Sequence, residues 1–206
     1  MFRDRKDAGE KLGIALQAYR NSNSLVLAIP RGGVEVGYEV AKVLDADFSL
    51  LICRKLPYPD NPESGFGAIA EDESLYINEA AAAPLSNSLI EQTIQQQKEE
   101  IQRRIQILRK GKPLPAIEGR TVILVDDGSA MGSTMHAAVA LCRKKHAKEI
   151  IVAVPVAGAH AIREFEQLAD DIVVLESPPY FYAVAQVYQN WYDVSDEEVL
   201  EIMRRP

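Results

Sequence analysis

Hydrophobic residues of this chain gather in short runs that alternate with amphipathic stretches. The amphipathic stretches cover residues 34–44, 134–145 and 159–168, and each has the length of a short helix. The apolar runs have the length of buried strands and lie at residues 25–29, 48–53, 121–125, 150–156 and 172–175. Strands that alternate with helices in this way predict a parallel sheet with helical crossovers.

Two further helices are predicted outside this alternation. The first covers residues 5–20 and has Ala8, Leu12, Ile14 and Leu16 among its buried positions. The second covers residues 88–109, and its apolar stripe is expected to face the core or another subunit. That stripe consists of Ile90, Ile94, Ile101, Ile105 and Leu108.

The remaining segments are shorter and richer in turn-forming residues. Three prolines and a glycine predict a loop over residues 56–66, and residues 67–78 have the pattern of a hairpin whose turn is 71–73. Ser195 and Glu198 have the spacing of a capping box, which predicts a last helix.

These elements together predict an α/β fold with a doubly wound, mostly parallel sheet, flanking helices and a small hood or hairpin region. The length of 206 residues suits one domain over 1–206, in which the hood and the C-terminal helix occupy about 177–206. Sheets of this kind bind their ligands at the carboxyl ends of the strands, so the candidate chemistry is expected there.

Composition narrows the classes of protein that fit. The net charge of −7 argues against a nucleic-acid-binding protein, and no apolar run approaches the ~20 residues that cross a membrane. The first ten residues contain both acidic and basic side chains, which is unlike a secretory signal. The two cysteines, Cys53 and Cys142, are far apart and form no CxxC motif. We therefore expect a cytoplasmic protein with two packed thiols. The basic residues near 103–112 are expected to form a solvated helix end.

The most informative segment follows the apolar run 121–125 and reads Asp-Asp-Gly-Ser-Ala-Met-Gly-Ser-Thr. The glycines allow a close backbone approach, and the first turn of the following helix offers unpaired N–H groups that suit a phosphate. Ser133 and Thr134 add hydroxyl donors, whereas Asp126 and Asp127 can accept hydrogen bonds from sugar hydroxyls. This combination predicts a site for a ribose 5-phosphate.

Residues 122–134, VILVDDGSAMGST, resemble the phosphoribosyl pyrophosphate (PRPP) signature of type I phosphoribosyltransferases. The stretches LVLAIPRGGVEVGYEVAKVL and CRKLPYPDNPESGFGAIAEDE, and the start FRDRKDAGEKL, are similar to a bacterial and archaeal subgroup of that family. The likeness covers nearly the whole chain. It implies transfer of a phosphoribosyl group to a nitrogenous acceptor, a role in nucleotide metabolism, and Mg²⁺ held mainly by PRPP and water. We expect a homo-oligomer, with a dimer favoured.

The resemblance also implies a role for each matching residue. Asp126 and Asp127 would bind the ribose hydroxyls, and with Arg31 and Lys55 they are the candidate catalytic residues. The 5-phosphate would be bound by Gly128, Ser129, Ala130, Met131, Gly132, Ser133 and Thr134. The pyrophosphate would be bound by Arg31, Gly32, Gly33, Arg54 and Lys55. The acceptor would contact Phe181, with Tyr182 beside it.

One residue departs from the family pattern, which usually has threonine where this chain has Met131. Methionine supplies no hydroxyl for the phosphate, so a PRPP- or nucleotide-sensing protein without catalysis is the alternative function. A receiver-type phosphoacceptor domain also has paired acids after a strand. That class needs a phosphorylatable aspartate at the end of a later strand, but the run 172–175 is followed by Glu176.

Overall fold

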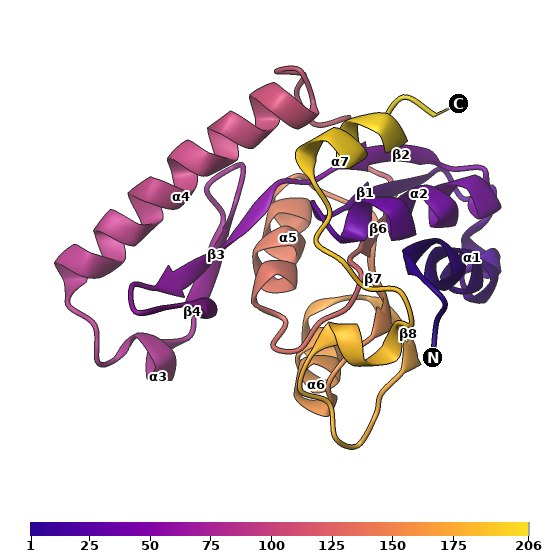
Figure 1. Cartoon of the computed structure of the whole chain (residues 1–206). Helices are drawn as coiled ribbons and strands as arrows, with labels where there is room; N and C mark the ends of the chain where they lie inside the picture. Colours follow the sequence, from indigo (N-terminus) through magenta and orange to yellow (C-terminus); the bar gives the residue numbers. More distant parts are fainter. Residues whose placement is uncertain (206) are drawn as a thin grey trace.

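The computed structural model of the chain describes residues 1–205. Its centre is a parallel sheet, as predicted, and the strand order is β2-β1-β6-β7-β8 (Figure 1). The strands are β1 (Ser24–Ala28), β2 (Asp47–Leu50), β6 (Thr121–Val125), β7 (Glu149–Val156) and β8 (Asp171–Glu176). Strand order reverses direction beside β1, which places a ligand crevice between the ends of β1 and β6.

Helices cover both faces of this sheet. Residues of α1 (Arg5–Ala15) and α2 (Gly33–Leu44) pack with one face, and residues of α5 (Ser133–Lys144) and α6 (Ala159–Leu168) pack with the other. Helix α1 is shorter than predicted, since Gln17–Tyr19 form a 3₁₀ turn. Ile14 is 60% exposed, because it lies about 200° around the helix from the buried Leu12.

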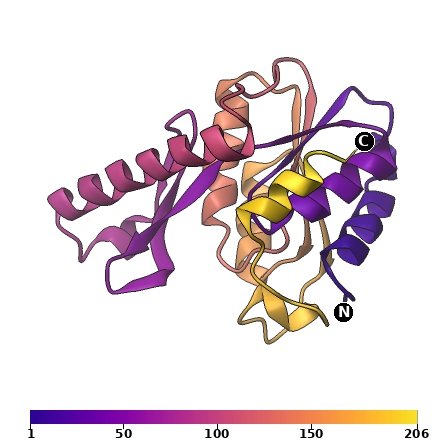
Figure 2. The same cartoon turned by 45° about the horizontal axis from the view of Figure 1, so that its top comes forward.

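A separate arm extends from the sheet (Figures 1 and 2). It consists of the antiparallel strands β3 (Cys53–Tyr58), β4 (Asn61–Ala70) and β5 (Leu75–Ile77), with the helices α3 (Glu79–Ala82) and α4 (Asn87–Leu108). The hairpin predicted over 67–78 is confirmed as β4–β5, but α3 was not predicted. The stripe on α4 faces the core: Ile101 and Leu108 are buried there, and the other three isoleucines pack beside them.

Two sequence predictions fail in this arm. The run 48–53 is divided between two sheets, because the parallel strand β2 ends at Leu50 and Cys53 already pairs with Ala70 in the arm. Residues 56–66 are not a loop but most of the β3–β4 hairpin. Pro57 is tolerated because the register shifts on both sides of it, in an edge strand where a missing N–H costs little.

The chain after β8 crosses back over the body. It forms a 3₁₀ turn (Val184–Val187), and Tyr188 forms an isolated parallel bridge with Phe2. The last helix, α7 (Asp196–Ile202), begins at the predicted capping box of Ser195 and Glu198. The hood segment is therefore held against the N-terminus. Among residues 1–205, no helix has the length and apolarity that a membrane crossing requires.

Candidate active site

The crevice forms where β1 and β6 end side by side, since Ala28 pairs with Val125 at the last position of both strands. The Pro30–Gly33 turn after β1 then meets the acidic turn after β6. Contact between the turns is so close that a Cβ atom on Gly32 would lie 1.9 Å from Asp127 Oδ2. A side chain at position 32 would therefore displace the Asp127 carboxylate, and the two predicted ligand loops form one continuous surface.

The paired carboxylates have different partners. Asp126 Oδ1 accepts a hydrogen bond from the backbone N–H of Asp127 at 2.8 Å, and the Tyr188 hydroxyl donates to the Asp127 carbonyl oxygen at 2.6 Å. Burial, followed by the charge of Asp127, raises the pKa of Asp126 well above its ordinary value. Burial also raises the pKa of Asp127, although Arg5 opposes this shift. The acidic turn is thus a desolvated site in which a hydroxyl donor would be well bound.

Arg5 is the cation of this turn, and sequence analysis did not select it. Its Nε donates to Asp127 Oδ2 at 2.9 Å, and its Nη1 donates to the Tyr192 carbonyl oxygen at 2.9 Å. The guanidinium also lies 4.0 Å from the centre of the Trp191 ring. The start FRDRKDAGEKL was noticed only for its resemblance, and nothing in the local sequence indicates that Arg5 reaches a turn 122 residues away.

On one side of Asp127 lies a cavity of about 290 Å³ that contains four arginines. Arg31 and Gly32 come from the turn after β1, Arg54 from β3 and Arg104 from α4, while Arg5 completes the set. The prediction that the basic residues over 103–112 form a solvated helix end is wrong for two of them. Arg104 is only 6% exposed, and Arg109 is buried too. Arg104 is on the buried face of α4, and Arg109, the residue after the helix, is paired with the buried side chain of Glu71.

The charges of this arginine cavity are only partly balanced. Arg31 lies 3.6 Å from Asp196 and Arg104 lies 2.8 Å from Glu100, but Arg54 donates to the neutral Gln97 side chain at 3.0 Å. Burial lowers the pKa of Arg54, and repulsion by Arg104 and Arg31 adds to the shift. A bound polyanion would relieve this repulsion, so the cavity is suited to pyrophosphate.

A second cavity, of about 570 Å³, begins at the residue after Asp127, and its floor is the whole predicted phosphate loop, 128–134. Gly132 caps helix α5 with φ of +79°, a conformation that favours glycine, and the first N–H groups of α5 follow it. Tyr58, Ser64 and Gly65 of the β3–β4 hairpin form the opposite wall. The geometry is that of an anion site at a helix N-terminus covered by a hairpin.

Strand β3 connects the two cavities. Successive side chains of a strand point to opposite faces, and accordingly Arg54 lines the arginine cavity whereas Lys55 lines the phosphate-loop cavity. The predicted pair Arg54-Lys55 is therefore divided between two sides of the site.

The predicted acceptor residues, Phe181 and Tyr182, are not among the residues that line either cavity. Phe181 is partly buried in the cluster of Phe2 and Val187, and its ring would be 3.3 Å from a Cβ on Gly158. Tyr182 is 81% exposed. The aromatic residue that does line the arginine cavity is Trp191, which the sequence reading of the hood did not select.

Comparison with known proteins agrees with this geometry. The family model for the phosphoribosyl transferase domain matches residues 5–190, so the chain belongs to that family. A Mycobacterium tuberculosis protein, provisionally named a phosphoribosyl transferase, is 37% identical over 207 residues, which is 100% of this chain and 47% of that protein. The chain thus spans about half the length of the curated relatives that it matches.

Solved structures support the same fold. The crystal structure of the protein TT1426 from Thermus thermophilus is 36% identical, with a TM-score of 0.82 over 98% of this chain and 97% of that one. A protein of Aquifex aeolicus is 13% identical with a TM-score of 0.53, over 83% of this chain and 72% of that one. The receiver-type alternative is therefore wrong, and the fold is that of the phosphoribosyltransferases.

Proposed function

We propose that the protein transfers the phosphoribosyl group of PRPP to a nitrogenous acceptor, a nucleobase being the first candidate. The observation that carries the proposal is that Asp127 lines one anion site and Gly128, the next residue, lines a second anion site of a different kind. Four arginines line the first site, and a helix N-terminus covered by a hairpin forms the second. PRPP has pyrophosphate at one end, a 5-phosphate at the other and two hydroxyls between them, which is the same order of chemical groups.

In this proposal each group has a defined task. Arg31, Arg54 and Arg104 bind the pyrophosphate and stabilise the charge that develops on it as the C1–O bond breaks. The acceptor nitrogen forms the new bond to C1, and its proton leaves to solvent or pyrophosphate. Asp126 and Asp127 hold the ribose hydroxyls, while Lys55 and the turn 128–134 hold the 5-phosphate.

We also propose that Mg²⁺ accompanies PRPP. Within residues 1–205 no three acidic, histidine or cysteine side chains gather closely enough to hold a metal ion by themselves. Asp126 and Asp127 are the two carboxylates of the acidic turn, so a cation here would take most of its ligands from PRPP oxygens and water, which suits Mg²⁺. When bound, Mg²⁺ would supply charge neutralisation for the pyrophosphate.

The direct test is pyrophosphate release from PRPP with Mg²⁺ across a panel of purine and pyrimidine bases. Release that depends on one base or one class of bases supports the proposal. The Met131 departure favours the sensor alternative, because this side chain is 62% exposed on the floor where the family places a hydroxyl. PRPP binding in calorimetry without release with any base would establish a sensor instead.

The Met131→Thr substitution should tighten PRPP binding by roughly tenfold, because it adds one hydrogen bond to a charged group. The 5-phosphate is bound in both the ground state and the transition state, so the Michaelis constant for PRPP should fall with little change in turnover. Met131→Ala is the matched control, since it removes the bulk without adding a hydroxyl. Equal affinities of Met131→Thr and Met131→Ala would show that position 131 does not face the phosphate.

The β3–β4 hairpin is expected to close over bound PRPP, because Tyr58, Ser64 and Gly65 form one wall of the phosphate-loop cavity. Hydrogen exchange should therefore slow at residues 58–65 when PRPP is added. The turn between the antiparallel strands β4 and β5 lines neither cavity, so its hydrogen exchange serves as the internal reference. Identical exchange at residues 58–65 with and without PRPP would contradict closure.

A further inference from the structure

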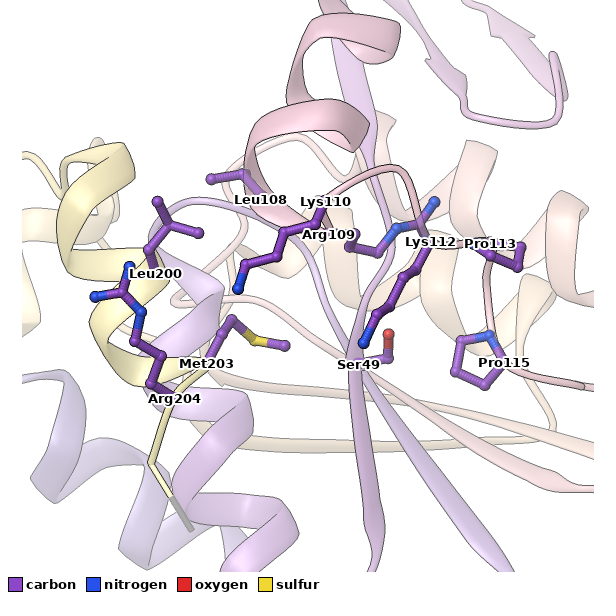
Figure 3. Close-up of a pocket in the computed structure, with 10 residues that line it drawn as sticks. All are labelled: Ser49, Leu108, Arg109, Lys110, Lys112, Pro113, Pro115, Leu200, Met203 and Arg204. Carbon is purple, nitrogen blue, oxygen red and sulfur yellow. The ribbon is translucent and has the colours of Figure 1, made fainter.

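A third cavity, of about 260 Å³, lies outside the proposed active site. It is an open hollow bordered by the end of α4, the segment 109–115 that follows, Ser49 of β2, and α7 (Figure 3). None of the residues that line it lines either cavity of the active site. Its floor is apolar, formed by Leu108, Leu200 and Met203, and two prolines form one side.

Three cationic side chains surround this floor: Lys110, Lys112 and Arg204. Figure 3 shows the two lysine side chains extending from the segment after α4 toward Met203 and Ser49, with Arg204 on the α7 side. The described residues include no salt-bridge partner for any of the three, whereas the neighbouring Arg205 lies 3.4 Å from Glu35. All three residues are exposed, so in a chain whose net charge is −7 they form a local group of cations that would attract an anionic ligand.

Helix ends explain part of this charge. Cations near the carboxyl ends of α4 and α7 interact favourably with the helix dipole, which accounts for Lys110 and Arg204. Lys112 lies four residues beyond the end of α4 and is outside that effect. Arg109 also lines the cavity, but its guanidinium is paired with Glu71 and donates to the Leu50 carbonyl oxygen, so it adds no free charge.

We propose that this cavity binds a nucleoside polyphosphate, with the base on the apolar floor and the phosphates among Lys110, Lys112 and Arg204. An apolar floor suits a planar ring, and the cations at its rim suit several phosphate charges. The Ser49 hydroxyl is the polar group available to the ring. We refer to this cavity below as the α4–α7 cavity.

Helix α7 connects the α4–α7 cavity to the arginine cavity. Its first residue, Asp196, lies 3.6 Å from Arg31 and 3.3 Å from Arg103 of α4. A ligand that holds α7 against α4 would stabilise the Arg31–Asp196 pair, and bound pyrophosphate would compete for the same Arg31. The two ligands should therefore weaken each other's binding, by the reciprocity of coupled sites. This coupling rests on the proposed function, but binding in the α4–α7 cavity does not.

The test measures ATP binding by calorimetry, without PRPP, to three proteins. They are the wild type, the triple variant Lys110→Gln/Lys112→Gln/Arg204→Gln, and the control Lys145→Gln/Lys148→Gln/Arg163→Gln, which removes three charges away from all three cavities. ATP should bind the wild type and the control alike and the first variant at least tenfold more weakly. Two results would overturn the proposal. One is equal affinity for all three proteins, which is expected if ATP binds in the active site, and the other is no ATP binding to the wild type.

A second measurement separates this site from the proposed function. PRPP affinity of the wild type should fall at least fivefold with saturating ATP, and the triple variant should lose this effect while retaining its own PRPP affinity. If PRPP fails to bind any of the proteins, the proposed function fails, but ATP binding in the α4–α7 cavity can still be judged from the first measurement. If ATP binds in that cavity and leaves PRPP affinity unchanged, the coupling through α7 is wrong.

Discussion

Replacing Asp127 with asparagine should weaken PRPP binding by roughly ten- to a hundredfold, the range expected for losing a hydrogen bond to a charged group. Asp127 Oδ2 lies at the junction of the two ligand turns, where a Cβ on Gly32 would be 1.9 Å away. The substituted amide keeps an oxygen that can accept from Arg5 Nε, so the shape of the turn is retained. Calorimetry with PRPP and Mg²⁺ measures the change.

Asp127→Asn also leaves Arg5, which is 4% exposed, beside a neutral group. We therefore expect a loss of about 1–3 kcal/mol in the free energy of unfolding, and PRPP binding must be measured well below the melting temperature. Asp170→Asn is the matched control, because Asp170 pairs with Arg143 at 2.8 Å and lines neither cavity of the active site. Unchanged PRPP affinity in Asp127→Asn would refute the ribose-binding role.

Replacing Arg5 with glutamine should cost about 3–5 kcal/mol of stability, because it removes one partner of an ion pair whose side chains are 4% and 13% exposed. The hydrogen bond to the Tyr192 carbonyl and the contact with Trp191 are lost at the same time. For a chain of this length the melting temperature should fall by about 10 °C. Arg5→Lys is the matched control, since it keeps the charge and loses the planar guanidinium.

The pH dependence separates loss of charge from loss of packing. Arg5 lowers the pKa of Asp127 against the effect of burial, so its removal should raise that pKa further. The folded state then binds more protons than the unfolded state above the ordinary carboxyl pKa, and stability falls as pH rises. Relative to the wild type, Arg5→Gln should therefore be less destabilised at acidic than at alkaline pH.

A double variant completes this test. Arg5→Gln/Asp127→Asn removes both charges, and it should recover a large part of the stability lost in Arg5→Gln. Thermal unfolding across pH measures both effects. A deficit in Arg5→Gln that is independent of pH and unchanged in the double variant would show that Arg5 acts by packing alone.

The local sequence determined the framework of the protein. Five apolar runs alternating with amphipathic stretches predicted the parallel sheet, because a strand buried on both faces needs a continuous apolar run. The acidic turn after residues 121–125 and the glycines of Pro30–Gly33 followed from the same logic, since both lie at the ends of neighbouring strands. These features depend on residues close together in the chain, so their pattern is visible without the fold.

The tertiary structure decided how the site is completed. Arg5 reaches Asp127 across 122 residues, and Arg104 faces the arginine cavity only because α4 packs its buried face toward β3. The sequence reading treated Arg104 as part of a solvated basic run, since charge alone does not show which face of a helix is covered. Arg54 and Lys55, adjacent in sequence, serve opposite cavities because β3 passes between them. Long-range packing determines which side chains come into contact, and residue patterns within a short segment do not show those contacts.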